Sequence, residues 1–377
     1  MRVVHVADPG VGEPAVLLVD GQGCIVEDVA AFLRALTARR FSPNTVRAYA
    51  YDVQKLMLFL DDRGLTLQDF TPARAVDFLV TLRRTSSTGR AQRLDLAATT
   101  DRGRLLSPRT CNRILAAVSS FYEFLITCER YDGGENPILK QADSGAIRAA
   151  GRWRPPLLNS KKQIPVRRTL RVKTVDSLPR PIADETYRAL ILVMRTKRDR
   201  ALLELMHEGG LRPGEALGLR LEDISYGRRR VTVRHRDDHP KGVRQKSRRE
   251  RVVDLLEGRA LPAINDYVLR ERPQDAETGY VFLVGGRGKR RHEPLSYDGM
   301  VRMFARAAER ASVRDAWLTP HTLRHTHATR MFEGGMRELT LMARLGHASP
   351  DSTKIYTRIS DHEVAADYRR ALESEGQ

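Results

Sequence analysis

Apolar residues recur at helical spacing in the first third of the chain. The clearest run follows Ser42 and Pro43, where one helical face collects Val46, Tyr49, Val53, Leu56 and Leu60. Serine followed by proline is an N-cap and first-turn signal, and Gly64 ends the run. We therefore predict an amphipathic helix over residues 44–64.

Two further helices carry a similar start signal, Thr-Pro at residues 71–72 and Ser-Pro at residues 107–108. The second helix runs toward Tyr131 with its apolar residues in step. The stretch from 85 to 106 has little apolar content and is expected to loop over the surface. The pattern predicts a small helical bundle over residues 26–131.

The first residues of the chain show a different pattern. Residues 1–25 contain AVLLVDGQGCIV, two short apolar runs around a glycine-bearing turn. This pattern predicts a β-hairpin, and we interpret the segment as a small N-terminal extension.

Residues 132–180 are basic and are broken by prolines, with GGENP, GRWRPP and SKKQIPVRRTLRVKT in succession. The composition is typical of a linker, and its charge favours a path along DNA phosphates. A solvated spacer without contact to DNA is the alternative. The candidate DNA-binding residues of this segment are Lys161, Lys162, Arg167, Arg168 and Arg171.

A second, larger domain is predicted over residues 181–377. Helical runs are predicted at 183–195, 197–208, 257–271 and 296–312, with helices onward to the C-terminus. Two short β-branched strands are predicted at 229–235 and 250–255. There is no alternating βαβ pattern and no internal repeat. The predicted fold class is mainly α with a small β-sheet.

Charge narrows the class of partner. Lysine and arginine number 65 against 47 acidic residues, a formal net charge of +18 over 377 residues. This balance predicts a polyanionic partner, with nucleic acid ahead of an anionic membrane surface. No apolar run approaches the roughly 20 residues that span a bilayer, so no membrane contact is expected. Three cysteines without CxxC spacing suit a reducing compartment, and we expect a cytoplasmic, nucleoid-associated protein.

Two arginines are candidates for binding a phosphate. Arg212 follows the helix-ending pair Gly209 and Gly210, so it lies where one helix turns into the next. The planar fork of arginine can hold two phosphate oxygens, and Arg324 in HTLRHTHATRMF offers a second fork. Two forks on one phosphate would neutralise the charge that builds up in a pentavalent transition state. Taken singly, Arg212 could be a helix cap and Arg324 a surface arginine.

His321 is three residues before Arg324 and shares its helical face. It can donate to a phosphate oxygen or move a proton. His321 and His325 could instead bind zinc, but no HExxH glutamate, cysteine or clear third ligand accompanies them. We expect no metal, and we interpret His325 and His327 as structural or DNA-proximal.

Tyr356 in LGHASPDSTKIYTR is the candidate nucleophile. A tyrosine hydroxyl has an ordinary pKa of about 10, so it needs positive charge and a proton acceptor nearby. The two arginines, His321 and His347 could supply both. The leaving sugar oxygen needs a proton, for which Lys246 is the candidate general acid in a charged turn between two strands. Other basic residues of this turn could simply hold DNA: Lys241, Arg244, Arg248 and Arg249.

These segments together resemble the tyrosine recombinase, or phage integrase, family. GLRPGEALGLRLEDI resembles the first arginine box of that family, with Arg212 and, at its acidic position, Glu215. HTLRHTHAT is similar to the HxxR box. LGHASPDSTKIYTR is similar to the last box, with His347 as the second histidine and Tyr356 as the nucleophile.

KSRRERVVDL is similar to the hairpin that carries the catalytic lysine of the family. Counting back from its strand selects Lys246 over Lys241. The sequence departs from the family pattern at Asp254, where proline is usual, and this departure bears on the lysine assignment.

The resemblance implies a helical core-binding, SAM-like domain and an α+β catalytic domain that grip a DNA duplex as a C-shaped clamp. It implies a 3′-phosphotyrosyl intermediate and a free 5′-hydroxyl, without ATP, metal or any other cofactor. VGGRGKRR at 284–291 accordingly lacks the GKS/T ending of a phosphate loop and is interpreted as a basic turn, with Lys289 as a DNA-binding candidate.

The resemblance also implies partners. Four protomers act on two double-stranded DNA sites through a Holliday junction, and DNA-bending or co-recombinase proteins are possible accessories. The tail HEVAADYRRALESE at 362–375 has one apolar face and is interpreted as a docking helix, on a neighbouring protomer or on its own chain.

Several functions share this pattern. An integrase or transposase of a mobile element is preferred, because the basic LRVKTVDSLPRPI segment and the N-terminal segment resemble the longer mobile-element members. A chromosome or plasmid dimer resolvase is the alternative. A type IB topoisomerase would use the same chemistry and rejoin the same strand, and a DNA-binding protein without catalysis would be expected to lack one of the six polar residues.

Overall fold

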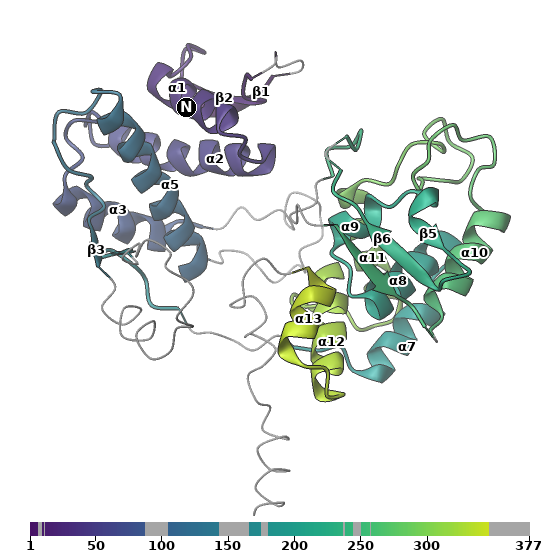
Figure 1. Cartoon of the computed structure of the whole chain (residues 1–377). Coiled ribbons are helices and arrows are strands. Elements are labelled where there is room, and N and C mark those ends of the chain that lie inside the picture. Colours follow the sequence, from purple (N-terminus) through teal and green to yellow (C-terminus); the bar gives the residue numbers. More distant parts are fainter. Residues whose placement is uncertain are drawn as a thin grey trace, which may run out of the picture. The chain divides into compact units, whose positions relative to one another are not determined.

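The computed structural model describes residues 1–6, 10, 12–86, 105–142, 166–174, 180–236, 238–243, 250–256 and 258–346. The chain divides into two compact units, Met1–Val175 and Asp176–Gln377 (Figure 1). Both units are mainly helical with small sheets, which confirms the predicted fold class.

Four helices form most of the described part of the first unit: α1 (Glu27–Ala38), α2 (Pro43–Asp61), α3 (Pro72–Arg84) and α5 (Pro108–Thr127). Three of them begin at the predicted caps. The side-chain oxygens of Ser42, Thr71 and Ser107 accept hydrogen bonds from backbone amides three residues later, at 3.1, 3.4 and 3.2 Å. Proline follows each cap at the first helical position, where its missing amide costs no hydrogen bond.

An ion pair joins two helices of this bundle, and the side chain of its arginine is 48% exposed. Asp52 of α2 is 1% exposed and pairs with Arg113 of α5. Burial raises the pKa of Asp52 to about 6, because the loss of water outweighs the opposing charges of Arg113 and Lys55. The pair therefore connects α2 to α5 through a buried carboxylate and an arginine that remains in contact with water.

The N-terminal hairpin differs from the predicted one in its strand pairing. β2 (Val16–Val19) pairs antiparallel with β1 (Arg2–His5), whereas the sequence pattern paired it with the apolar run after the glycine turn. That turn does return the chain, because Val19 and Ile25 form a single antiparallel bridge. Val16 and Leu18 are buried in the core of the helices, so the described part of the segment is packed onto the bundle.

Two described stretches of the predicted linker, 132–142 and 166–174, belong to the first unit and pack within it. β3 (Lys140–Ala142) pairs antiparallel with β4 (Val166–Arg168). The side chain of Asn112 on α5 donates to the carbonyl of Val172 and accepts from its amide, both at 2.9 Å. The composition predicted a linker along DNA phosphates, with a solvated spacer as the alternative. In the described part, apolar residues that alternate with the arginines supply packing contacts to the first unit.

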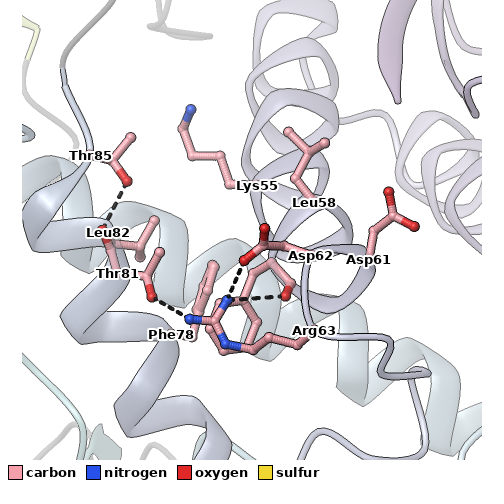
Figure 2. Close-up of a pocket in the computed structure, with 10 residues that line it drawn as sticks. Lys55, Leu58, Asp61, Asp62, Arg63, Phe78, Thr81, Leu82 and Thr85 are labelled. Carbon is pink, nitrogen blue, oxygen red and sulfur yellow. Dashed lines mark hydrogen bonds and ion pairs between the residues drawn. The ribbon is translucent and has the colours of Figure 1, made fainter.

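A pocket of about 560 Å³ opens between the C-terminal halves of α2 and α3 (Figure 2). Arg63 extends along it and donates to Asp62 at 3.2 Å and to the hydroxyl of Thr81 at 3.4 Å. The guanidinium also lies 4.0 Å from the ring centre of Phe59. The pocket belongs to the unit that carries none of the predicted catalytic residues.

The second unit combines helices with one small sheet: α7 (Asp184–Leu192), α8 (Lys197–Gly209), α9 (Pro213–Leu217), a 3₁₀ turn η1 (Leu221–Asp223), β5 (Ile224–Ser225), β6 (Arg230–Val233), β7 (Arg251–Asp254), α10 (Ala260–Arg270), α11 (Tyr297–Arg310), α12 (Pro320–Glu333) and α13 (Glu338–Leu345). The strands are antiparallel in the order β5-β6-β7. The helices and strands predicted between 183 and 312 are confirmed within a few residues of each end. The predicted docking helix at 362–375 lies outside the described residues.

Helices α8 and α10 pack antiparallel, and a carboxylate near the end of each one accepts a hydrogen bond from the start of the other. Glu208, near the end of α8, accepts from the amide of Ala260 at the start of α10, at 2.9 Å. Glu271, after α10, accepts from the amide of Lys197 at the start of α8, at 2.6 Å. Each negative charge thus lies at a helix N-terminus, where free amides and the helix dipole stabilise it. The far end of α8 is thereby held where the predicted arginine box begins.

Candidate active site

The predicted first arginine lies at a tight junction between two helices. α8 ends at Gly210, which adopts the left-handed conformation with a φ of 61°. Arg212 follows as the N-cap residue of α9. A Cβ on Gly210 would lie 2.4 Å from the ring of His327, so this position requires glycine for its conformation and for the space.

The second predicted arginine projects from α12 into the interior. Arg324 is 3% exposed, and its guanidinium donates to the carbonyls of Gly210 at 2.8 Å and Leu345 at 2.7 Å. These carbonyls belong to the C-terminal ends of α8 and α13, where intrahelical partners are missing. Arg324 is therefore a buried residue that joins two helix ends, and the alternative of a surface arginine is wrong.

Glu215 stands between the two predicted arginines and is fully buried. Its carboxylate accepts from Nη1 of Arg212 at 2.8 Å and from two nitrogens of Arg251 at 2.7 and 3.1 Å, and it lies 3.7 Å from Arg324. Burial by itself would raise the pKa of Glu215, but the hydrogen bond and charge of Arg251, with the charges of Arg324 and Arg212, lower it to about 2. The carboxylate is thus ionised and binds three guanidiniums.

The last turn of α13 faces the same cluster. Three successive backbone carbonyls, of residues 344, 345 and 346, each accept from the guanidinium of a different arginine. The donors are Arg251 at 2.8 Å, Arg324 at 2.7 Å and Arg212 at 3.4 Å, in that order. The orphan carbonyls of a helix C-terminus carry partial negative charge, which favours cations there. Residues that are far apart in the sequence, from 212 to 346, therefore meet at one positively charged site.

The first histidine lies at the start of α12, in its first turn, and is exposed. His321 and Arg324 come from the same helix as predicted, but Arg324 points into the core. His325 is half-buried, and burial together with the charge of Arg324 lowers its pKa. Among the residues that the structure describes, no group of three or more His, Cys, Asp or Glu could hold a metal ion.

His327 is structural, in agreement with one of the two interpretations of the sequence. Its Nε2 accepts from Nε of Arg344 at 3.0 Å, so Nδ1 carries the proton and donates to the carbonyl of His207 at 3.1 Å. Burial and the charge of Arg344 lower the pKa of His327 to about 3. It is a neutral ring that supports the ends of α8 and α13.

The hairpin predicted to carry the general acid is present as β6 and β7, with Val231 opposite Val253. Lys241 lies after β6, and its ammonium pairs with Glu293 at 2.7 Å. Asp254 is the last residue of β7, and its carboxylate pairs with Arg230 at 3.2 Å. The remaining predicted residues lie outside the described part of the chain: Lys161, Lys162, Arg244, Lys246, Arg248, Arg249, His347 and Tyr356.

Comparison with known proteins identifies the family. Residues 181–363 match the family model of the phage integrase family, and residues 29–128 match that of the phage integrase N-terminal SAM-like domain. Transposase A from transposon Tn554 of Staphylococcus aureus is 31% identical over 386 residues, which cover 99% of this chain and 98% of that protein. This chain belongs to the phage integrase family of tyrosine recombinases. It is an enzyme of DNA strand cleavage and rejoining in site-specific recombination.

Other relatives of this recombinase include the tyrosine recombinase XerD of Mycobacterium tuberculosis, 30% identical over 338 residues that cover 88% of this chain and 92% of that protein. Two solved structures share the fold. The Tn1549 transposon integrase in complex with transposon right-end DNA has a TM-score of 0.61 at 16% identity, with 92% of this chain and 99% of that chain covered. XerH bound to palindromic difH substrate has a TM-score of 0.57 at 15% identity, with 89% and 82% covered.

The other predicted DNA-binding residues of the recombinase that the structure describes lie at two places. Arg167 and Arg168 are on β4 and Arg171 follows it, with Arg167 and Arg171 exposed and Arg168 half-buried. Lys289 is exposed in the turn of VGGRGKRR, which the amides of Val284 and Gly285 close by donating to the carbonyls of Glu293 and Arg291, at 2.8 and 2.9 Å. The interpretation of that segment as a turn is confirmed.

In the described part of the chain, no helix is long and apolar enough to cross a membrane.

Sequence reasoning missed Arg251, the third guanidinium on Glu215. A signal for it was available, because side chains alternate between the two faces of a strand. Val253 is fully buried and Val252 is exposed, so Arg251 shares the inward face of β7. An arginine on the buried face of a strand needs a buried partner, and Glu215 is the acidic residue within reach.

Replacing Gly210 by alanine tests the helix junction. Gly210→Ala adds a Cβ at a left-handed φ and against His327, so we expect the free energy of unfolding to fall by roughly 2–4 kcal/mol. Urea unfolding followed by circular dichroism measures it. Gly227→Ala is the control, because no atom lies within 4 Å of its Cβ and its φ is outside the left-handed region. Equal effects of the two changes would contradict the assigned role of Gly210.

Proposed function

We propose that this recombinase is the transposase or integrase of a mobile DNA element. The observation that carries the proposal is the similarity to Transposase A, which covers 99% of this chain and 98% of that protein. The similarity to XerD covers a smaller share of this chain, 88%. Resolution of chromosome or plasmid dimers is the second candidate, because XerD proteins are also among the relatives.

In the proposed mechanism, Tyr356 attacks the scissile phosphate. The tyrosine oxygen forms a bond to phosphorus, and the bond from phosphorus to the 5′ oxygen breaks, so that a 3′-phosphotyrosyl enzyme and a free 5′-hydroxyl result. Lys246 gives the leaving oxygen its proton, and His321 and His347 bind the phosphate or accept the tyrosine proton. A 5′-hydroxyl of the partner strand then attacks phosphorus and releases the tyrosine. The energy of the original bond is conserved in the intermediate.

The arginine cluster supports this mechanism through its charge. Arg212 and Arg324 converge on the carboxylate of Glu215 and on the carbonyl of Leu345. The contacts of Arg212 with the carbonyls of Leu345 and Gly346 are long, at 3.4 Å, so a phosphate oxygen can replace them with shorter, charge-assisted hydrogen bonds. Gly346 also immediately precedes His347 in the chain, ten residues before Tyr356.

The proposal extends to the assembly on DNA. Residues 26–131 and 181–377 would grip opposite faces of the duplex as a C-shaped clamp, joined by 132–180. Four protomers would act on two sites through a Holliday junction, with residues 362–375 as the docking helix and DNA-bending or co-recombinase proteins as accessories. The exposed candidates for phosphate contacts in the described part of the chain are Arg167, Arg171, Lys241 and Lys289. The nucleoid is the proposed place of action.

The biological role is tested by the sites that the recombinase joins. DNA bound from a random pool, followed by trapping of the covalent adduct, yields the recognised sequence and the cleaved phosphate. Plasmids that carry this site are then tested against identical and non-identical partner sites. A mobile-element enzyme is expected to join its site to partners of different sequence. Exchange only between two identical sites would contradict the proposal and favour a resolvase.

Tyr356→Phe removes the nucleophilic hydroxyl and leaves the ring. We expect DNA affinity to be unchanged and the covalent adduct on a nicked trapping substrate to be lost, because only the oxygen can bond to phosphorus. Tyr226→Phe is the matched control, since Tyr226 is an exposed tyrosine and is not predicted to act in catalysis. A persistent adduct with Tyr356→Phe would refute the nucleophile assignment.

Lys246→Ala and Lys241→Ala distinguish the two candidate general acids. Lys241 is paired with Glu293, so its loss is expected to leave cleavage close to wild type. Loss of Lys246 is expected to slow cleavage by about 10²- to 10⁴-fold, as for a lost general acid. A substrate with sulfur as the leaving atom should restore much of the rate, because a thiolate leaves without a proton. Rescue of Lys241→Ala instead would reverse the assignment.

A further inference from the structure

Arg251 is a buried arginine that belongs to neither arginine box. It begins β7, and its side chain is 8% exposed. Its three nitrogens all have partners: Nη1 and Nη2 donate to the two carboxylate oxygens of Glu215 at 3.1 and 2.7 Å, and Nε donates to the carbonyl of Arg344 at 2.8 Å. These bonds use three of the five N–H groups of the guanidinium, and all three end on groups in the protein interior.

The partners of Arg251 are the groups that hold the two candidate catalytic arginines. Glu215 accepts from the amide of Arg212 at 2.9 Å and from its Nη1 at 2.8 Å, and lies 3.7 Å from Arg324. The carbonyl of Arg344 precedes those of Leu345 and Gly346, which accept from Arg324 and Arg212. Arg251 therefore contacts both sides of the site, the carboxylate on one side and the α13 turn on the other.

We propose that Arg251 is a positioning residue for strand cleavage, which holds Glu215 and the last turn of α13 so that Arg212 and Arg324 face one phosphate. The inference rests on the proposed function, because the phosphate is that of the tyrosine reaction. The fork of arginine is required, since only a planar group with parallel donors binds both oxygens of Glu215 while a third nitrogen reaches α13.

The place of Arg251 in the chain adds a second consequence. It lies five residues after Lys246, the candidate general acid, and it contacts the residue that is three positions before His347. One side chain thus links the strand after the general acid to the helix before the nucleophile segment. Loss of this link is expected to affect the chemical step more than DNA binding, because the side chain of Arg251 is 8% exposed and bonds to groups of the protein.

The test compares Arg251→Lys with a control variant that breaks an exposed ion pair on the same hairpin. Arg230→Gln removes the arginine of the Arg230–Asp254 pair, whose side chains are 40% and 45% exposed. With saturating nicked substrate, the single-turnover rate of adduct formation in Arg251→Lys is expected to fall by on the order of 10²-fold, as for misplaced catalytic groups. The dissociation constant for DNA should stay close to wild type. The melting temperature should fall with the lost buried hydrogen bonds and must stay above the assay temperature. Arg230→Gln should change none of the three.

A pH profile separates positioning from a general structural role. In Arg251→Gln, Glu215 keeps its burial and the charges of Arg212 and Arg324 but loses its strongest partner, so its pKa rises. Glu215 is then protonated at a higher pH, and the acid limb of the cleavage rate moves toward neutral pH. In the double variant Arg251→Gln with Glu215→Gln, this shift disappears and the two rate losses are less than multiplicative.

The outcomes separate the two proposals. A wild-type protein that forms no adduct on its selected site overturns the proposed function and this inference with it. A wild-type adduct with an unchanged single-turnover rate in Arg251→Lys overturns the inference alone. The inference also fails if Arg251→Lys weakens DNA binding and leaves the rate at saturating DNA intact. If Arg251→Gln does not fold, Arg251→Lys and its double variant with Glu215→Gln still decide the matter through their rates.

Discussion

The site depends on one buried carboxylate. Without Glu215, three guanidiniums in the interior would lack a counter-charge, and the cost of burying them would far exceed any packing gain. With it, Arg212, Arg251 and Arg324 share one negative charge, and two positive charges remain. Backbone carbonyls at the ends of α8 and α13 stabilise that excess through their partial charges. The excess is suited to a phosphodiester whose negative charge increases during attack.

Two glycines end α8 and α13 in turns that expose backbone carbonyls to the arginines. Gly210 ends α8 and Gly346 ends α13, and both adopt the left-handed conformation that other residues rarely take. Each turn directs its own carbonyl toward an arginine, Gly210 to Arg324 and Gly346 to Arg212. The left-handed backbone conformation and the close neighbours therefore explain why glycine occupies these positions of the first and last boxes. They let the two helices end where the arginines need acceptors, and they leave room for His327 and Arg251.

Much of the fold was predictable from local chemistry. Capping hydroxyls before prolines marked the starts of α2, α3 and α5, because a cap bonds to an amide only three residues away. The hairpin of β6 and β7 followed from two β-branched runs. The partner of β2 was predicted wrongly, because the glycine turn indicated the run after it and not Arg2–His5. Contacts of Val172 with Asn112 join residues sixty positions apart, which no local pattern reports.

The sequence by itself determined the family, the helical class and the identity of Arg212, Glu215, His321 and Arg324 as candidates, because these depend on motifs whose spacing is local. Only the tertiary structure decided that Glu215 binds three arginines, that Arg251 is one of them and that α13 supplies the carbonyls. The reason is that burial and charge compensation are properties of a packed interior. Residues from α9, β7, α12 and α13 acquire one electrostatic environment only after the chain has brought them together and excluded water.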